Sequence, residues 1–450
     1  MKKFLGIFML FAILLTAACN AILDQDEIKQ TTEESQPMQE TADTPSGTYE
    51  SGLVKSNAAR EMSPEVNPED ASALVKNNSQ FAFKFYEQIR QGSENIIFSP
   101  ISLSLALSMT LAGADSATEN ALSEALQLTL PEENVHPAFN SLLMSLEDSQ
   151  KDLPEEFQGN KFQLNIANSI WTQVGYDFKQ NFLDILARHY GAGIYNVDYK
   201  KDSEAARLAI NDWIEEETKD KIKDLVPPGA ITPLTRLVLA NAIYFYGSWF
   251  HPFDEAATAD APFTLLDGSE KTVDMMSLSG EGFPYAYGDN YQAIQLPYLS
   301  QDFVMTILLP DQDQYLDFEA NLDSEKFAKI MEIMAYKDVD LKMPKFDFTS
   351  SIGAKNPLIQ MGMGEAFDAD RADFSAMTDT EELFISDVLH KATITVDEQG
   401  TEAAAATAVI MRAASIQVDP IPLVLDRPFM FFIQHQPTGT ILFMGRVVEP

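Results

Sequence analysis

The run from Leu237 to Trp249 (LVLANAIYFYGSW) limits the choice of fold more than any other part of this sequence. It is apolar over almost its full length, which is typical of a β-strand buried on both faces. The other strand-like runs are 95–100, 163–171, 292–296, 303–309, 339–343 and 391–396, and a C-terminal hairpin formed by 429–434 and 440–448. Helical spacing of apolar residues or helix-forming composition marks 73–89, 102–112, 118–126, 182–190 and 205–218. Helices dominate the first half and strands the second, without a βαβ repeat, so the pattern predicts an α+β fold.

Charge and cysteine content narrow the classes of protein that fit. The net charge of -37 argues against nucleic acid and anionic lipid head groups as partners, because both would be repelled. Cys19 is the only cysteine of the 450 residues, so no disulfide can form within the chain. The fold must therefore be held by its core.

The N-terminus has the order of a targeting segment. Lys2 and Lys3 precede an apolar run from Phe4 to Leu15, and the small residues Thr16-Ala17-Ala18 lead to Cys19. That run is too short for a comfortable permanent membrane span. We expect a lipoprotein signal over 1–19, with lipidation of Cys19 and a secreted protein anchored on the extracytoplasmic side. The alternative is an ordinary secretory signal that leaves an unmodified cysteine.

Residues 20–70 read as an acidic, disordered tether. They carry 12 Asp and Glu against 3 Lys and Arg, with few large apolar residues. Such a segment cannot offset its ordering entropy by burial, and its charge keeps it extended. The globular pattern begins at Ala71 and continues to Pro450, which predicts one domain over 71–450.

The segment from Glu398 to Ser415 allows two interpretations. Its first eleven residues carry no large apolar side chain. Read with period two, Thr401, Ala403, Ala405, Thr407, Val409 and Met411 form one uncharged face. The segment therefore fits a solvent loop in one state and a central strand in another. Composition alone favours an Ala-rich helix or a flexible linker.

The amino-acid sequence of this segment resembles that of a known protein family. EQGTEAAAAT after HKATITVD is similar to the hinge of the reactive-centre loop in serpins. Further motifs that resemble the family cover almost all of the chain after residue 73: NIIFSPISLSLAL, NSIW, INDW, NAIYFYGSW, LPY, ADFS, HKA, RPFMFFI and ILFMGRVV. The resemblance implies three β-sheets, about eight or nine helices and an exposed reactive-centre loop. Ser116 departs from the pattern, because the family commonly has glycine there, and we expect a local effect on one helix start.

The resemblance also implies the functional residues. The hinge would comprise Glu398, Gly400, Thr401, Glu402, Ala403, Ala404, Ala405, Ala406 and Thr407. A polar cluster under the main sheet, which must re-pair its hydrogen bonds when the strands part, would comprise Ser99, Ser102, Asn241 and His390. Counting fourteen places from the hinge glycine puts the reactive bond between Ala414 and Ser415, with Arg412 as the alternative contact residue.

These residues imply a suicide-substrate inhibitor of serine proteases. A small residue at Ala414 suits elastase-like or subtilisin-like targets, whereas Arg412 would suit trypsin-like ones. The alternative function is a non-inhibitory serpin that acts as a surface binding or chaperone-like lipoprotein. Such members typically carry proline, charged or bulky residues in the hinge, and this chain has alanines.

Other chemistry finds no support in the sequence. There is no G-x-S-x-G elbow or H-E-x-x-H helix, and the five histidines are scattered. Asp368, Asp370 and Asp373 lack the glycine and distal glutamate of a calcium loop. The region 131–151, where many serpins carry a basic heparin-binding helix, is acidic here. We expect a monomer that is not an enzyme, without cofactor or metal and without a heparin-type polyanion as partner.

Overall fold

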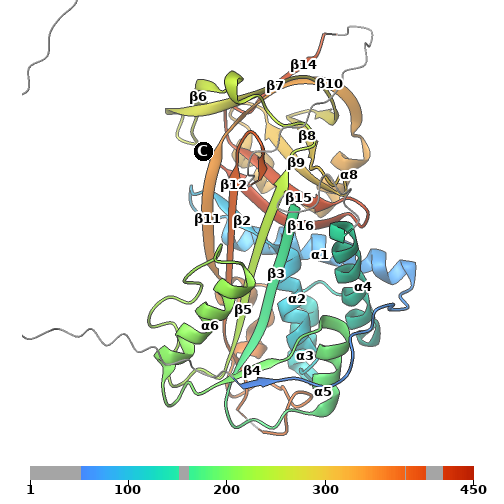
Figure 1. Cartoon of the computed structure of the whole chain (residues 1–450), viewed down its shortest axis with the longest axis vertical. Coiled ribbons are helices and arrows are strands. Elements are labelled where there is room, and N and C mark those ends of the chain that lie inside the picture. The colour runs from blue at the N-terminus through green and yellow to red at the C-terminus, as the bar shows by residue number, and fades with distance from the viewer. Residues whose placement is uncertain (1–51, 152–161, 381, 402–418) are drawn as a thin grey trace, which may run out of the picture. The chain divides into compact units, whose positions relative to one another are not determined.

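The computed structural model describes residues 52–151, 162–380, 382–401 and 419–450. Within these residues the chain forms nine α-helices around two hydrogen-bonded sheets (Figure 1). The helices are α1 (Pro68–Ile89), α2 (Pro100–Leu111), α3 (Ser116–Ala125), α4 (Glu132–Lys151), α5 (Gln180–Ile185), α6 (Ser203–Glu217), α7 (Tyr315–Ala320), α8 (Ser324–Glu332) and α9 (Lys355–Gln360). A π-helical turn, Leu186–Tyr190, continues α5, so the predicted single helix over 182–190 changes its geometry halfway.

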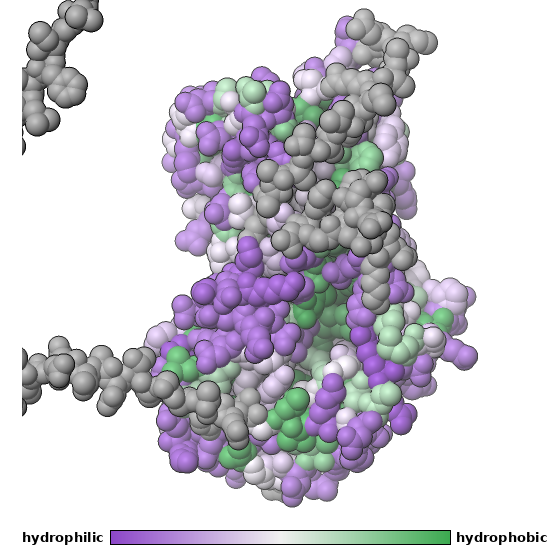
Figure 2. All heavy atoms as spheres, in the orientation of Figure 1, coloured by the Kyte–Doolittle hydropathy of each residue, from purple (hydrophilic) through white to green (hydrophobic). Residues whose placement is uncertain are grey.

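The main sheet has seven strands in the order β1-β4-β3-β5-β13-β12-β11. Their bounds are β1 (Gly52–Val54), β3 (Phe162–Gln173), β4 (Ile194–Val197), β5 (Leu237–Ser248), β11 (Phe346–Gly353), β12 (Ile385–Val396) and β13 (Gly400–Thr401). Strand β5 is buried at all twelve positions, as its apolar sequence predicts. Helix α6 covers part of one face of this sheet, and Figure 2 shows mostly hydrophilic residues over that helix.

The second sheet has nine strands and joins two of the three sheets that the sequence leads us to expect. They are β2 (Ile96–Phe98), β6 (Ala259–Thr264), β7 (Glu270–Gly288), β8 (Tyr291–Pro297), β9 (Phe303–Pro310), β10 (Ala335–Pro344), β14 (Ile421–Val424), β15 (Phe429–His435) and β16 (Thr440–Val447). The 19-residue strand β7 makes the junction, because its residues 270–275 pair with β6, its residues 285–288 pair with β8, and β10 pairs with the stretch 275–285 between them.

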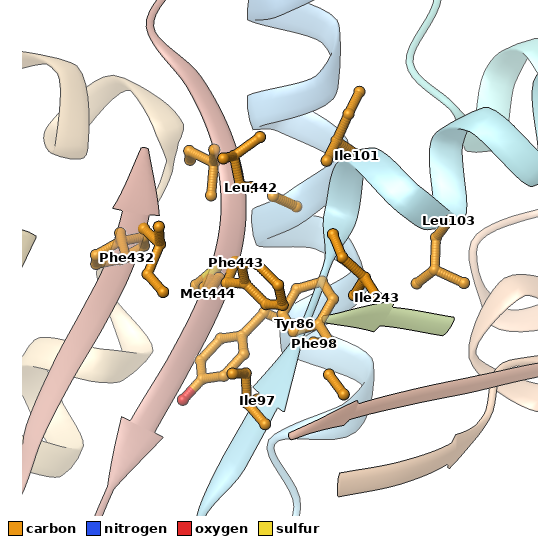
Figure 3. Packing of buried hydrophobic residues seen from close by; sticks show 14 of the residues in the cluster. Tyr86, Ile97, Phe98, Ile101, Leu103, Ile243, Phe432, Leu442, Phe443 and Met444 are labelled. Carbon is orange, nitrogen blue, oxygen red and sulfur yellow. The ribbon is translucent and has the colours of Figure 1, made fainter. Parts of the chain in front are cut away.

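The core lies where α1 and α2 meet the second sheet. Figure 3 shows Tyr86 of α1, Phe98 of β2, Ile243 of β5 and Phe443 of β16 converging on one cluster. A buried ion pair adds to it, since Arg446 lies 3.0 Å from Glu319 and donates to the carbonyl oxygens of residues 90, 92 and 94. This core joins α1 and β2 to strands β15 and β16, which are far from them in sequence.

The compact part begins before the predicted boundary at Ala71. Gly52–Val54 pairs antiparallel with β4, and Asn67 caps α1 by accepting the Glu69 N–H at 2.9 Å. The segment 20–70, predicted from its acidic composition to be a disordered tether, therefore contains a strand and the start of a helix near its C-terminal end. The lipidation residue Cys19 and most of the tether lie outside the described residues.

Candidate functional site

The centre of the main sheet is closed along one half and divided at the other end. Strands β5 and β12 pair in parallel from Leu237 opposite Ile385 to Ile243 opposite Ala392. Beyond that point β13 lies between them, with Thr401 paired to Gly247 on one side and to Val396 on the other. The start of the predicted loop therefore already occupies the gap between the two central strands.

The predicted polar cluster forms as one hydrogen-bonded unit beneath the closed half. Asn241 lies opposite His390 in the register, and its Oδ1 accepts from His390 Nδ1. The Asn241 amide donates to Ser102 Oγ at 2.5 Å. His390 Nε2 accepts the backbone N–H of Ser99 at 3.0 Å. All four residues are at most 1% exposed, so any exchange of their hydrogen-bond partners when the strands separate takes place away from solvent.

The cluster also explains a helix start. Ser99 Oγ accepts the Ser102 N–H at 3.2 Å, which caps α2, and Pro100 occupies the first helical position. Ser99 therefore caps α2 through its hydroxyl and donates its backbone N–H to the ring nitrogen of His390. Burial lowers the pKa of His390 to about 3, so the imidazole is neutral and Nε2 remains an acceptor.

A fifth member, Asn168, was missed by the sequence analysis. Its Oδ1 accepts from the Asn241 amide and from Ser102 Oγ, the latter at 3.3 Å. Asn168 lies opposite Asn241 in the β3–β5 register. The strand over 163–171 was predicted, but only the register shows that its single central amide faces this cluster.

The root of the loop is held by an ion pair. Glu398 is 5% exposed and lies 2.8 Å from the Lys345 ammonium, while Thr258 Oγ1 donates to its other oxygen at 2.6 Å. Burial opposes ionisation, but these hydrogen bonds outweigh it and keep the pKa of Glu398 below its usual value. Lys345 and Thr258 were not predicted, because nothing in their local sequence marks them.

Backbone contacts fix the same root. Trp249 N–H donates to the Gln399 carbonyl at 2.8 Å and its indole N–H to the Asp397 carbonyl at 3.1 Å. A Cβ built on Gly400 would lie 2.1 Å from the carbonyl oxygen of Gly247, so this close approach of two backbones requires glycine. The glycine of the predicted hinge therefore has a packing reason at position 400.

Thr401 is 1% exposed, and its hydroxyl lies 2.7 Å from the hydroxyl of Tyr298, whose ring stacks on Trp249. The side chain faces the interior, as the period-two pattern predicts. The remaining hinge residues Glu402, Ala403, Ala404, Ala405, Ala406 and Thr407, and the reactive-bond residues Arg412, Ala414 and Ser415, lie outside the described residues.

Three other features of the described residues bear on function. Among the described residues, no group of three or more His, Cys, Asp or Glu is placed to hold a metal ion. In the acidic turn, Arg371 contacts both Asp368 and Glu365, and Asp373 accepts the Ser375 N–H. No helix in the described part of the chain is long and apolar enough to cross a membrane.

Comparison with known proteins shows the family. Residues 76–450 match the family model described as Serpin (serine protease inhibitor). A serpin-like protein of Thermococcus kodakarensis is 37% identical over 379 residues, which cover 84% of this chain and 86% of that protein. The leukocyte elastase inhibitor of Sus scrofa is 36% identical over 384 residues, with 83% and 98% covered. The chain belongs to the serpin family.

Solved structures agree with the fold. The native state of the thermophilic serpin tengpin matches with a TM-score of 0.76 and 29% identity, over 88% of this chain and 98% of that one. Human thyroxine-binding globulin, solved with its hormone, matches with a TM-score of 0.75 and 29% identity, over 85% and 99%. The predicted α+β serpin fold is confirmed.

Proposed function

We propose that this serpin traps serine proteases as a suicide substrate. The protease serine attacks the carbonyl carbon of Ala414, the amine of Ser415 leaves with a proton, and Ala414 stays bound as an acyl ester. The freed loop then enters the main sheet as a strand between β5 and β12. The protease is carried along and distorted before water can hydrolyse the ester.

One observation carries this proposal: Gly400 and Thr401 already pair with β5 and β12 at the end of the gap. Insertion from this point separates seven register pairs between β5 and β12, from Ile243–Ala392 to Leu237–Ile385. Each of the two strands gains a new ladder in exchange. The small residues that follow Thr401 in sequence present little steric resistance to this movement.

The polar cluster supplies a barrier to premature opening. Separating β12 from β5 removes the bond between His390 and Asn241, and a buried polar group left without a partner costs about 1–3 kcal/mol. The Glu398–Lys345 pair adds a second restraint at the loop root. The native state is then held kinetically until cleavage frees the loop.

The proposed targets are elastase-like or subtilisin-like proteases. Ala414 presents a small side chain for a shallow pocket, and relatives include leukocyte elastase inhibitors. Mixing the protein with elastase, subtilisin, chymotrypsin and trypsin tests this. We expect a complex with elastase that survives denaturant, and a released C-terminal peptide that starts at Ser415.

A released peptide that starts at Ala413 would make Arg412 the contact residue and trypsin-like enzymes the targets. Clean cleavage without any complex would instead favour the non-inhibitory alternative, a surface binding or chaperone-like role. Thyroxine-binding globulin, maspin and a structure described as that of a tumour suppressing serpin are structurally similar to this chain, at 26–29% identity.

We also propose that the protein lies outside the cytoplasm, that a lipid on Cys19 joins it to a membrane, and that it is a monomer. The order of charged, apolar and small residues before Cys19 supports the anchor. The first turn of α4 carries Glu132 and Glu133, which would repel a sulfated polysaccharide, so we do not expect such a polyanion to be an activator. Labelling by a fatty-acid probe that disappears in Cys19→Ser tests the anchor.

A further inference from the structure

The main sheet shows where the tether enters the domain. Gly52 pairs with Asn196 of β4, Asn196 with Thr172 of β3, and Thr172 with Leu237 of β5. Gly52 is therefore level with the first residue of β5. Thr401 pairs with Gly247, at the other end of the same strand. Gly52 and Thr401 therefore lie at opposite ends of the main sheet.

The same register predicts where the cleaved loop ends. Thr401 opposite Gly247 starts an antiparallel pairing with β5, and its continuation places Ala414 opposite Leu234. Leu234 lies three residues beyond the level of Gly52, and the inserted strand lies four strand spacings away from β1. With spacings of about 4.8 Å and a rise of about 3.3 Å per residue, Ala414 ends roughly 20 Å from Gly52.

We propose that the tether is a spacer that leaves room for the captured protease. This role rests on the proposed function, because it is loop insertion that brings the protease to the tethered end. When the chain is held at Cys19, the protease must fit between the domain and the surface that holds the chain. Inhibition by the anchored protein then requires a tether longer than a protease is wide.

The lengths agree with this requirement. A protease of about 230 residues has a radius of gyration of about 17 Å and is therefore about 45 Å across. Gly52 follows Cys19 by 33 residues. A chain of that length reaches about 110 Å when fully extended and about 30 Å on average as a flexible coil. Room for the protease thus needs a stretched tether, which the acidic composition favours by self-repulsion.

The residues after Gly52 cannot lengthen the tether unless their contacts with the rest of the domain break. Ser56 donates to Asp184, the Lys55 ammonium donates to the Gly191 carbonyl at 2.5 Å, and Arg60 lies 2.6 Å from Glu147. These bonds fasten the segment after β1 to α5, the following turn and α4. The usable spacer therefore ends at β1.

Thiol coupling tests the spacer independently of lipidation, because Cys19 is the only cysteine. The chain from Cys19 onward is coupled to maleimide beads in three forms: unchanged, with residues 22–45 deleted, and with residues 22–45 replaced by a Gly/Ser sequence of equal length. The deletion leaves Gly52 nine residues after Cys19, a reach of about 30 Å. Pancreatic elastase is the probe, and covalent complex and residual protease activity are measured on beads and in solution.

In solution we expect all three forms to give the same yield of complex. On beads we expect the deletion form to yield at least fivefold less complex, to be cut at the same bond and to release active protease. The Gly/Ser form keeps the full reach but loses the self-repulsion, so it should yield less complex than the unchanged form and more than the deletion form. Equal yields from all three forms on beads would overturn the spacer role. If no form traps protease in solution, the proposed function itself fails, and the spacer role with it.

Discussion

Thr401 is the residue at which the structure can be tested most directly. Its side chain is buried against Tyr298, and the period-two pattern places Glu402 on the opposite, solvent face. Because Thr401 already lies between β5 and β12, Thr401→Arg must either bury an unpaired charge, at a cost on the order of several kcal/mol, or keep residue 401 out of the sheet both before and after cleavage. We expect the variant to fold and to be cut at the same bond, but to act as a substrate.

Residual protease activity, measured at increasing molar ratios of inhibitor to protease, gives the stoichiometry of inhibition and so measures this effect. Glu402→Arg is the matched control and should change the stoichiometry of inhibition much less. An unchanged stoichiometry in Thr401→Arg would mean that loop insertion is not the inhibitory step.

Individual residues also show the limits of the sequence. The cluster residues Ser99, Ser102, Asn241 and His390 were predicted through the family motifs, and the structure brings them together. Asn168 and Lys345 were missed because each acts through a partner far along the chain, Asn241 and Glu398. A local pattern records whether a side chain is polar, but the register of the sheet decides which other polar group it meets.

At the scale of elements, the start of α3 explains a departure from the family pattern. Ser116 is its first residue and has φ of 54°, in the left-handed region that favours glycine. Its hydroxyl donates to exposed Asp115 and also interacts with the carboxylate of Asp373. Because a left-handed non-glycine residue costs about 1–2 kcal/mol, we expect Ser116→Gly to stabilise the protein by about 1 kcal/mol.

Thermal and urea midpoints check this expectation. Ser123→Gly, in the interior of the same helix, removes a serine where φ is not left-handed and should lower stability by roughly 0.5 kcal/mol. If both variants shift the midpoints in the same direction, strain at Ser116 is not the reason.

Elements differ in how well the sequence predicts them. Strand β5 and helix α2 were placed to within two residues, because both are mostly apolar and are buried along their full length. Strand β1 was not predicted, since Gly52–Val54 is three residues long and is stabilised by pairing with β4. The joining of two expected sheets through β7 depends on long-range pairing, which no period in the sequence reports.

At the scale of the whole molecule, buried histidines should set the acid stability. Burial lowers the pKa of His390 and His136 to about 3 and that of His435 to about 4, below the value of about 6.5 in an unfolded chain. The unfolded state therefore binds more protons as the pH falls below 6.5, and stability is lost from there towards pH 3.

Each pKa unit corresponds to about 1.4 kcal/mol, so His390 alone should remove about 2–3 kcal/mol between pH 7 and pH 4.5. Urea midpoints at pH 7, 5.5 and 4.5 measure the loss. In His390→Gln, an amide that offers a hydrogen-bond donor and acceptor but does not titrate replaces the imidazole, so the decline should be smaller. An equal decline in both proteins would contradict the assignment.

The pairing of β2 with β16 also determines when the molecule can be completed. Arg446 donates to the Glu94 carbonyl across 352 residues of sequence, and Ile96–Phe98 has its β-partner in Met444–Arg446. At about 5–20 residues per second, a ribosome needs roughly 20 to 70 s to make the intervening chain. For that whole interval the apolar residues of β2 have no partner strand on that side. Synthesis of the last few residues is therefore the event that allows the core to close, and truncation near the C-terminus should prevent folding altogether.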